Sequence, residues 1–148
     1  MDAFDSKILK LLIQNSRITG AEIARKVNLS LPAVTERLRK LASSGMIDQY
    51  TVKLNREKLG LQITAFINVW IDHTKKSHVK EQVIAMPEVL ECHHVAGDND
   101  LLLKVLVKDT AALENLLVNK IKAISAVTRT STTIILSSYK EEINPQTI

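Results

Sequence analysis

Between Gln62 and Tyr139 the sequence alternates strand-like and helix-like segments, and their order constrains the fold more than any other feature of the chain. The order is β-α-β-β-α-β. Two such split β-α-β units predict a four-stranded antiparallel sheet with both helices on one face, a ferredoxin-like sandwich. The strand-like segments are ITAFINVWID, VLECHHVAG, DLLLKVLV and VTRTSTTIILSSY, and the helix-like segments are KSHVKEQVIAM and TAALENLLVNKIKAI.

The third strand-like segment carries apolar residues on both of its faces. Leu101, Leu103 and Val105 alternate with Leu102 and Leu106. Because the two helices can cover only one face of the sheet, the opposite face needs cover from another source. A second copy of the chain is the simplest cover, so the sequence predicts a homodimer.

Residues 1–49 predict three short helices. In the segment TGAEIARKV, Thr19 and Glu22 have the spacing of a capping box. The helix that follows has Ser30 as its N-cap and ends before Gly45. A tight turn between the second and third helices makes a winged-helix-like helix-turn-helix domain, so the whole chain belongs to the α+β class.

The domain boundaries follow from these patterns. Residues 1–49 form the helix-turn-helix domain and residues 62–139 the ferredoxin-like domain. Residues 50–61 are predicted to be a linker strand and hinge, because MIDQYTVKL alternates β-branched and aromatic residues and NREKLG is a polar connector. Residues 140–148 are left as a tail.

The third predicted helix has two different faces. Val34, Leu38 and Leu41 form an apolar stripe, and polar side chains occupy the other side. A recognition helix of this kind enters the major groove of double-stranded DNA, where arginine pairs with guanine and threonine contacts the methyl group of thymine. Thr35, Glu36 and Arg39 are expected at base edges, and Arg25, Lys26, Arg37 and Lys40 at phosphates. The full predicted DNA-binding set is Arg25, Lys26, Ser30, Pro32, Ala33, Thr35, Glu36, Arg37, Arg39 and Lys40.

Charge and composition fit this interpretation. The formal net charge is +4, and residues 1–50 hold eight Lys or Arg against five Asp or Glu. In isolation, these charges could equally do no more than solvate a surface helix. The single cysteine, Cys92, excludes an intramolecular disulfide, and the sequence has neither a signal-peptide pattern nor an apolar run long enough to span a membrane. A prokaryotic cytoplasm, at the nucleoid, is the expected location.

Other classes of function fit the sequence less well. It has no glycine-rich phosphate loop, nucleophile elbow or metal-ligand spacing, so we expect no enzyme and no cofactor. In a strand, His93 points away from Cys92 and His94, which leaves too few ligands on one face for zinc. RNA binding through the sheet would need stacking aromatic residues, which DLLLKVLV lacks. The alternative that stays open is an effector-independent architectural protein that compacts DNA.

Many short motifs of the chain occur in the order seen in one family. They include the NSR from Asn15, EIA from Glu22, LS at Leu29, GMI from Gly45, the segment MPEVLECHHVAGDNDLLLKV and the closing KIKAISAVTRTSTTIIL. With these motifs, nearly the whole chain resembles the leucine-responsive/asparagine-regulator (Lrp/AsnC) family of transcriptional regulators.

The resemblance implies a DNA-binding domain joined to a domain for effector binding and oligomerisation. It implies dimers that gather into octamers of four dimers, and amino acids as effectors. Carried over by position, the effector pocket is Gly97, Asp98, Asn99 and Asp100 together with Thr128, Thr130 and Thr132. Many members have a large residue where this chain has Asn99. From the residues alone, the carboxylates could accept from an ammonium group and threonine hydroxyls could bond a carboxylate, but GDND is also ordinary turn chemistry.

Overall fold

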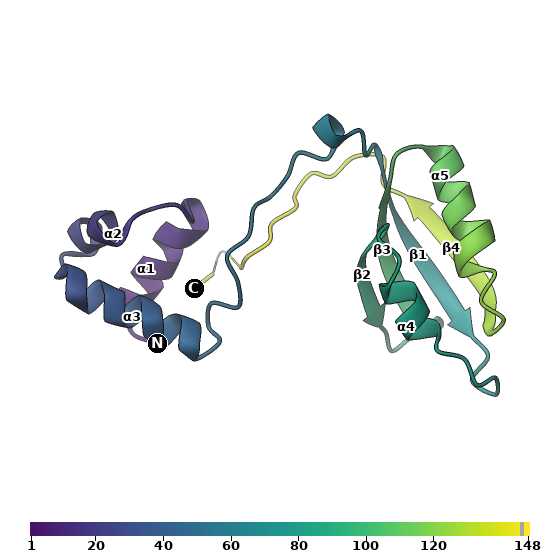
Figure 1. Ribbon diagram of the computed structural model, residues 1–148, viewed down its shortest axis with the longest axis horizontal. Coiled ribbons are helices and arrows are strands. Elements are labelled where there is room, and N and C mark those ends of the chain that lie inside the picture. The colour runs from purple at the N-terminus through teal and green to yellow at the C-terminus, as the bar shows by residue number, and fades with distance from the viewer. Residues whose placement is uncertain (146) are drawn as a thin grey trace. The chain divides into compact units, whose positions relative to one another are not determined.

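The computed structural model describes residues 1–145 and 147–148, and the chain divides into two compact units (Figure 1). The helix unit consists of residues 1–53 and 140–148. The sheet unit consists of residues 54–139.

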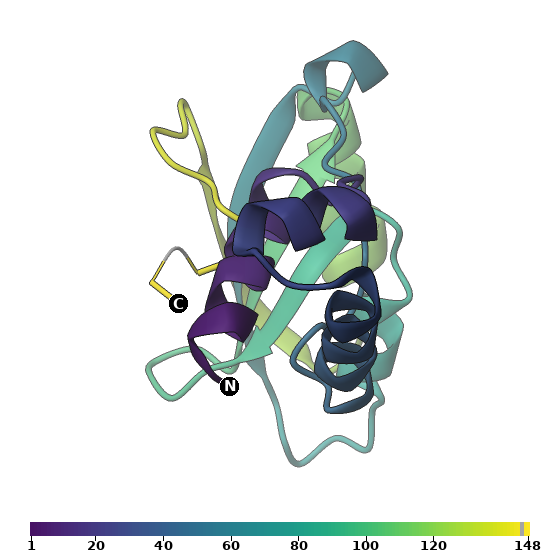
Figure 2. The same cartoon turned by 90° about the vertical axis from the view of Figure 1, so that its left-hand side faces the viewer.

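The helix unit is built from three helices (Figure 2). They are α1 (Ala3–Gln14), α2 (Gly20–Val27) and α3 (Leu31–Ser43). Ile8, Ile23 and Val34, one from each helix, are fully buried and form the centre of a small apolar core. The three predicted helices are therefore present.

Local capping explains why these helices begin and end where they do. Thr19 accepts a hydrogen bond from the Glu22 backbone N–H at 3.2 Å, and the Glu22 carboxylate accepts from the Thr19 N–H at 2.8 Å, as in a capping box. Asn28 ends α2 in the left-handed conformation, with φ of 57°, and Gly45 follows α3 with φ of 74°. These two positive φ angles let the chain reverse direction after each helix.

The sheet unit contains four antiparallel strands in the order β2-β3-β1-β4. The strands are β1 (Ile63–Ile71), β2 (Val89–His94), β3 (Leu101–Val107) and β4 (Val127–Ile134), and the helices are α4 (Val79–Ile84) and α5 (Thr110–Asn115). A short 3-10 turn, η1 (Glu57–Leu59), precedes β1, and the π-helical turn η2 (Leu116–Ile121) continues α5. The predicted ferredoxin-like α+β fold is confirmed.

Both helices pack on the same face of the sheet (Figure 1). Val83 of α4 and Leu113 and Leu116 of the second helical segment lie in one buried cluster with Ile67 and Leu103 of the strands. Alternation along each strand sends every second side chain to this face.

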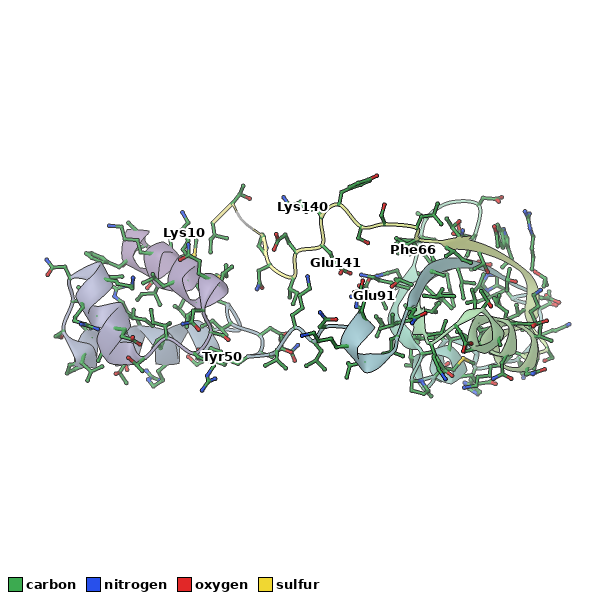
Figure 3. The ribbon with its side chains drawn as sticks, turned by 90° about the horizontal axis from the view of Figure 1, so that it is seen from above. Lys10, Tyr50, Phe66, Glu91, Lys140 and Glu141 are labelled. Atoms are coloured by element: carbon green, nitrogen blue, oxygen red, sulfur yellow. The ribbon has the colours of Figure 1, made fainter. Side chains whose placement is uncertain are left out.

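The helix-free face of the sheet carries the other alternate residues, including Phe66 of β1 (Figure 3). Phe66 lies opposite Lys104 in the ladder, and Leu106 of this face is buried even within one chain. The Lys104 ammonium lies 3.2 Å from a carboxylate oxygen of Glu91. The face is therefore apolar with charged groups among its apolar side chains.

The linker differs from the expectation. Residues 48–56 contain no strand, although Tyr50, Val52 and Leu54 have the alternation of one and are exposed (Figure 3). A strand needs a neighbouring strand to receive its backbone hydrogen bonds, and no strand of the helix unit is available in the described part of the chain. Predicting a linker strand from alternation alone was therefore wrong for the single chain.

The last residues lie against the helix unit. Residues 140–148 belong to the helix unit, where Ile148 packs against its apolar core. The Lys53 ammonium donates to the Glu141 carbonyl oxygen at 2.9 Å, which fixes the start of this segment. Sequence patterning could not predict this docking, because residues 140–148 show no periodic apolar pattern and Lys53 is 88 positions from Glu141.

The described residues form short helices. None of the helices that they form has the length and apolar character needed to cross a bilayer.

Candidate nucleic-acid interface and loop site

Helix α3 presents a polar face opposite its buried residues. Val34 and Leu41 are buried, whereas Thr35, Glu36 and Arg39 are exposed. The Thr35 hydroxyl donates to the Leu31 carbonyl at 2.9 Å, which leaves its methyl group on the surface of the helix. The predicted base-reading side chains therefore share one accessible face.

The turn between α2 and α3 fixes the start of this helix. Ser30 caps α3 by accepting from the Ala33 N–H at 3.4 Å, and Pro32 stands in the first turn, where its missing N–H costs nothing. Ser30 and Pro32 are exposed and Ala33 is half-buried. A methyl group added to Gly20 would lie 3.2 Å from the Leu31 side chain, so α2 approaches the beginning of α3 closely.

Arg37 has partners within the helix unit that the sequence did not predict. Its Nη1 lies 2.8 Å from the Asp2 carboxylate and 2.7 Å from the Asp5 carboxylate, at the N-terminus of α1. Its guanidinium also lies 5.5 Å from the centre of the Phe4 ring. The expectation that Arg37 meets a phosphate did not foresee these partners, because 35 and 32 positions of sequence separate them. Arg37 ties α3 to α1.

These contacts also set the ionisation of both carboxylates. The Asp5 backbone N–H, and then Arg37, hold the pKa of the Asp2 carboxyl below its ordinary value. The Asp2 backbone N–H, and then Arg37, do the same for the pKa of Asp5. Both groups are therefore charged at neutral pH, and the bridge that links the two helices is formed.

Glu36 and Arg39 form a two-pronged ion pair on the exposed face. Arg39 Nε donates to one carboxylate oxygen at 2.9 Å and Nη2 donates to the other at 2.8 Å. Hydrogen bonding to Arg39 lowers the pKa of Glu36 to about 2. The Lys40 ammonium lies 3.7 Å from the same carboxylate. One anion and two cations thus stand together on α3.

Positive charge also lies on α2. Arg25 and Lys26 are exposed in its last turn. Both side chains are long enough to reach a DNA backbone beside a helix seated in the groove.

The second candidate site is the loop between β2 and β3. Gly97 and Asp98 are exposed, and Asn99 donates from its amide to the Leu101 carbonyl at 2.9 Å. Gly97 has no positive φ, and an added Cβ would meet nothing within 4 Å. The backbone conformation at position 97 therefore does not require a glycine.

Asp100 is already held by its own chain. One carboxylate oxygen accepts from the Ile71 backbone N–H at 2.7 Å, and the other lies 2.7 Å from His73 Nε2. The hydrogen bond with His73, and then the one from Ile71, lower the pKa of Asp100. The charged carboxylate therefore connects the loop to the end of β1.

The threonines of β4 lie on the other side of β1. The Thr128 hydroxyl donates to the Trp70 carbonyl at 3.2 Å, and Thr130 and Thr132 lie opposite Val69 and Ile67 in the ladder. The Asp100 N–H donates to the Val69 carbonyl at 3.0 Å. The loop and Thr128 thus flank the same end of β1, while Thr132 lies farther along the strand.

Sequence reasoning missed His73 as a partner of Asp100. The β-α-β-β-α-β topology could have indicated the contact, because it places the end of β1 beside the start of β3. In β2, Cys92 lies opposite buried Leu103 and His93 opposite Leu102, so the two side chains alternate. Among residues 1–145 and 147–148, no three His, Cys, Asp or Glu side chains are arranged to hold a metal ion.

Comparison with known proteins assigns both units. Residues 1–48 match the winged helix-turn-helix DNA-binding model, and residues 64–145 match the Lrp/AsnC ligand binding domain. The chain is 32% identical over 141 residues to the HTH-type transcriptional regulator FL11 of Pyrococcus furiosus, covering 95% of this chain and 93% of that protein. It is 35% identical over 144 residues to the proline dehydrogenase transcriptional activator of Rhizobium radiobacter, covering 95% and 92%.

Solved structures agree over the whole chain. A transcriptional regulator of Neisseria meningitidis in complex with L-methionine superposes with a TM-score of 0.89 at 30% identity, covering 97% of this chain and 94% of that one. The feast or famine regulatory protein of M. tuberculosis, also complexed with L-methionine, has a TM-score of 0.88 at 31% identity and covers 97% of both chains.

These matches cover the DNA-binding and the ligand-binding parts in the order found here, and the matched proteins are transcriptional regulators rather than enzymes. The chain therefore belongs to the Lrp/AsnC family, as a transcriptional regulator with a helix-turn-helix DNA-binding domain and an Lrp/AsnC ligand-binding domain.

Proposed function

We propose that this protein binds specific sequences of double-stranded DNA through α3, and that an amino acid bound at the loop of residues 97–100 changes its assembly or its DNA binding. The exposed polar face of α3 carries the first part of this proposal. Thr35, Glu36 and Arg39 read base edges, and Arg25, Lys26 and Lys40 contact phosphates. Ser30, Pro32 and Ala33 lie against the DNA at the start of the helix, and Arg37 keeps its place within the helix unit.

Replacing Arg39 with alanine tests the reading of bases. A bidentate contact with guanine is worth about 1 to 3 kcal/mol, so Arg39→Ala should lose that much affinity for a duplex selected for tight binding and much less for random DNA. Fluorescence anisotropy titrations at fixed salt measure both affinities. Equal losses on both duplexes would make Arg39 a phosphate contact and would favour the architectural, effector-independent alternative.

The helix-free face of the sheet supports self-association. Its apolar side chains include Phe66 and Leu102, which are half-buried in the single chain and lie outside the buried cluster that α4 and α5 form with the sheet. In the dimer that we propose, two such faces pack together, and four dimers form the larger assembly. Joining the two faces removes apolar surface from water.

Leu102→Asp is expected to break this dimer. A carboxylate placed in an apolar interface loses its water without gaining a partner, so the dimer should dissociate at least tenfold more readily. Sedimentation velocity of the full chain measures this change, with Ile84→Asp on the exposed side of α4 as the matched control. An unchanged sedimentation coefficient for Leu102→Asp would exclude the helix-free face as the interface.

The loop supports the amino acid part of the proposal. The Asp98 carboxylate is exposed, and the Asp100 carboxylate keeps lone pairs beyond its bonds with Ile71 and His73. Either can accept from an α-ammonium group, and the hydroxyls of Thr128, Thr130 and Thr132 supply donors for a carboxylate. Two relatives of known structure hold L-methionine, which makes it the first ligand to try.

Calorimetry against the twenty amino acids, beginning with L-methionine, tests this site. Asp100→Asn keeps an acceptor for the Ile71 N–H but loses the charge, so it should weaken binding by about tenfold or more, the value of a charge-assisted hydrogen bond. Glu114→Gln on α5 removes the same charge away from the loop and serves as the control. Binding that is unchanged in Asp100→Asn would remove Asp100 from the site, and no binding to the parent protein would remove the effector.

A further inference from the structure

We infer that Glu36 is a positioning residue for DNA recognition, which holds the Arg39 guanidinium so that its outer edge faces one guanine. This inference rests on the proposed reading of bases by α3. It gives Glu36 a more specific function than direct contact with a base, because both of its carboxylate oxygens already accept hydrogen bonds from Arg39.

The geometry of the ion pair leaves one edge of Arg39 available. A guanidinium has five N–H bonds, arranged as a side edge at Nε and one terminal nitrogen and an outer edge across both terminal nitrogens. Glu36 accepts from Nε at 2.9 Å and from Nη2 at 2.8 Å, so it occupies the side edge. The outer edge, between Nη1 and Nη2, has the spacing that matches O6 and N7 of guanine.

Position on the helix supports this role. Glu36 and Arg39 are three residues apart, on the same exposed face as Thr35. Their side chains are 49% and 65% exposed, so the pair lies at the surface that would meet DNA. An isolated ion pair at the surface contributes little to the stability of a protein. Stabilisation of the fold is therefore a poor explanation for the two-pronged Glu36–Arg39 pair.

Holding the Arg39 side chain in place before DNA binds lowers the entropic cost of binding. A free arginine side chain loses rotamer freedom when it binds a base, and a side chain that is already held loses less. The negative charge of Glu36 opposes DNA binding, but Lys40 lies 3.7 Å from the same carboxylate and offsets it. The group of three side chains therefore keeps a net positive charge while one member is fixed in direction.

In vitro selection on randomised duplexes, followed by sequencing, tests the inference without a known operator. The full chain is compared with Arg39→Ala, Glu36→Gln and Asp48→Asn. Glu36→Gln and Asp48→Asn change the net charge equally, but Asp48 lies after α3, in the exposed segment that follows it. Circular dichroism checks that each variant is folded.

Arg39→Ala should reduce the preference for guanine at one position by about tenfold to a hundredfold. Glu36→Gln should reduce the preference at that same position by about twofold to tenfold, while Asp48→Asn leaves it unchanged. The Arg39 Nε–H signal in NMR spectra should be protected from exchange in the parent protein and exposed in Glu36→Gln.

Two results would overturn the inference, and they can be told apart. In the first, Arg39→Ala changes the guanine preference, but Glu36→Gln leaves that preference unchanged or only tightens binding to all DNA, as Asp48→Asn does. Positioning by Glu36 is then wrong, and the proposed contact of Arg39 with a base stands. If Arg39→Ala leaves every base preference unchanged, the base reading itself is wrong.

Discussion

Replacing Leu103 with alanine is expected to lower the free energy of unfolding of the sheet unit by about 2 to 5 kcal/mol. Leu103 lies in the middle of β3 and is fully buried. It faces the layer of α4 and α5, where it shares a buried cluster with Ile67 and Leu116. The truncation removes apolar contacts and leaves a cavity that a close-packed core can fill only in part.

The measurement can be confined to this unit. The only tryptophan, Trp70, lies on β1, so denaturant unfolding followed by its fluorescence reports the sheet unit. Leu102→Ala is the matched control, because it makes the same truncation on the opposite face of the same strand. At a fixed protein concentration, Leu102→Ala should lower the free energy of unfolding much less than Leu103→Ala does. Its main effect should be weaker self-association. Equal destabilisation by both variants would mean that the helix-free face is part of the same folded core.

Replacing Ile23 with alanine is expected to abolish DNA binding while leaving the sheet unit folded. Ile23 is fully buried between the helices, beside Ile8 and Val34. The expected loss is again about 2 to 5 kcal/mol, and a unit with so small a core has little stability beyond that. The unfolded fraction of the helix unit should therefore rise steeply, and α3 should lose its support.

Three measurements separate this outcome from general unfolding. Helical circular dichroism and DNA binding should fall, while the Trp70 fluorescence transition should stay at its parent denaturant midpoint. Ala21→Ser, at an exposed position of the same helix, should change the stability by less than about 0.5 kcal/mol. A shifted Trp70 transition in Ile23→Ala would show that the two units unfold together.

Local patterns were enough to predict the elements of the fold. Thr19 and Glu22 form the capping box that their spacing predicts, and Leu101, Leu103 and Val105 face the helices as alternation predicts. Such features depend on residues only a few positions apart. The prediction of a linker strand was wrong for the same reason. Alternation of residues indicates that a segment can form a strand, but it does not indicate whether a neighbouring strand is present to receive its hydrogen bonds.

Site chemistry was less predictable because distant residues decide it. Arg37 has the charge and position of a phosphate contact, and only the packing of α3 against α1 reveals that Asp2 and Asp5 hold it. His73 likewise meets Asp100 across 27 positions of sequence. Charge patterns identify which side chains can form ion pairs, but three-dimensional packing selects the pairs that form.

The docked tail makes the sheet unit an insertion within the sequence of the helix unit. For Ile148 to reach the helices, residues 54–139 must close as a loop, and closing a disordered loop of that length carries a large entropic penalty. Pairing of β1 with β4 removes most of this penalty, since Ala65 lies opposite Ile134 and the two ends of the loop emerge side by side. Docking of the tail is therefore more favourable when the sheet is folded, because the paired strands already hold the two ends of the inserted segment together.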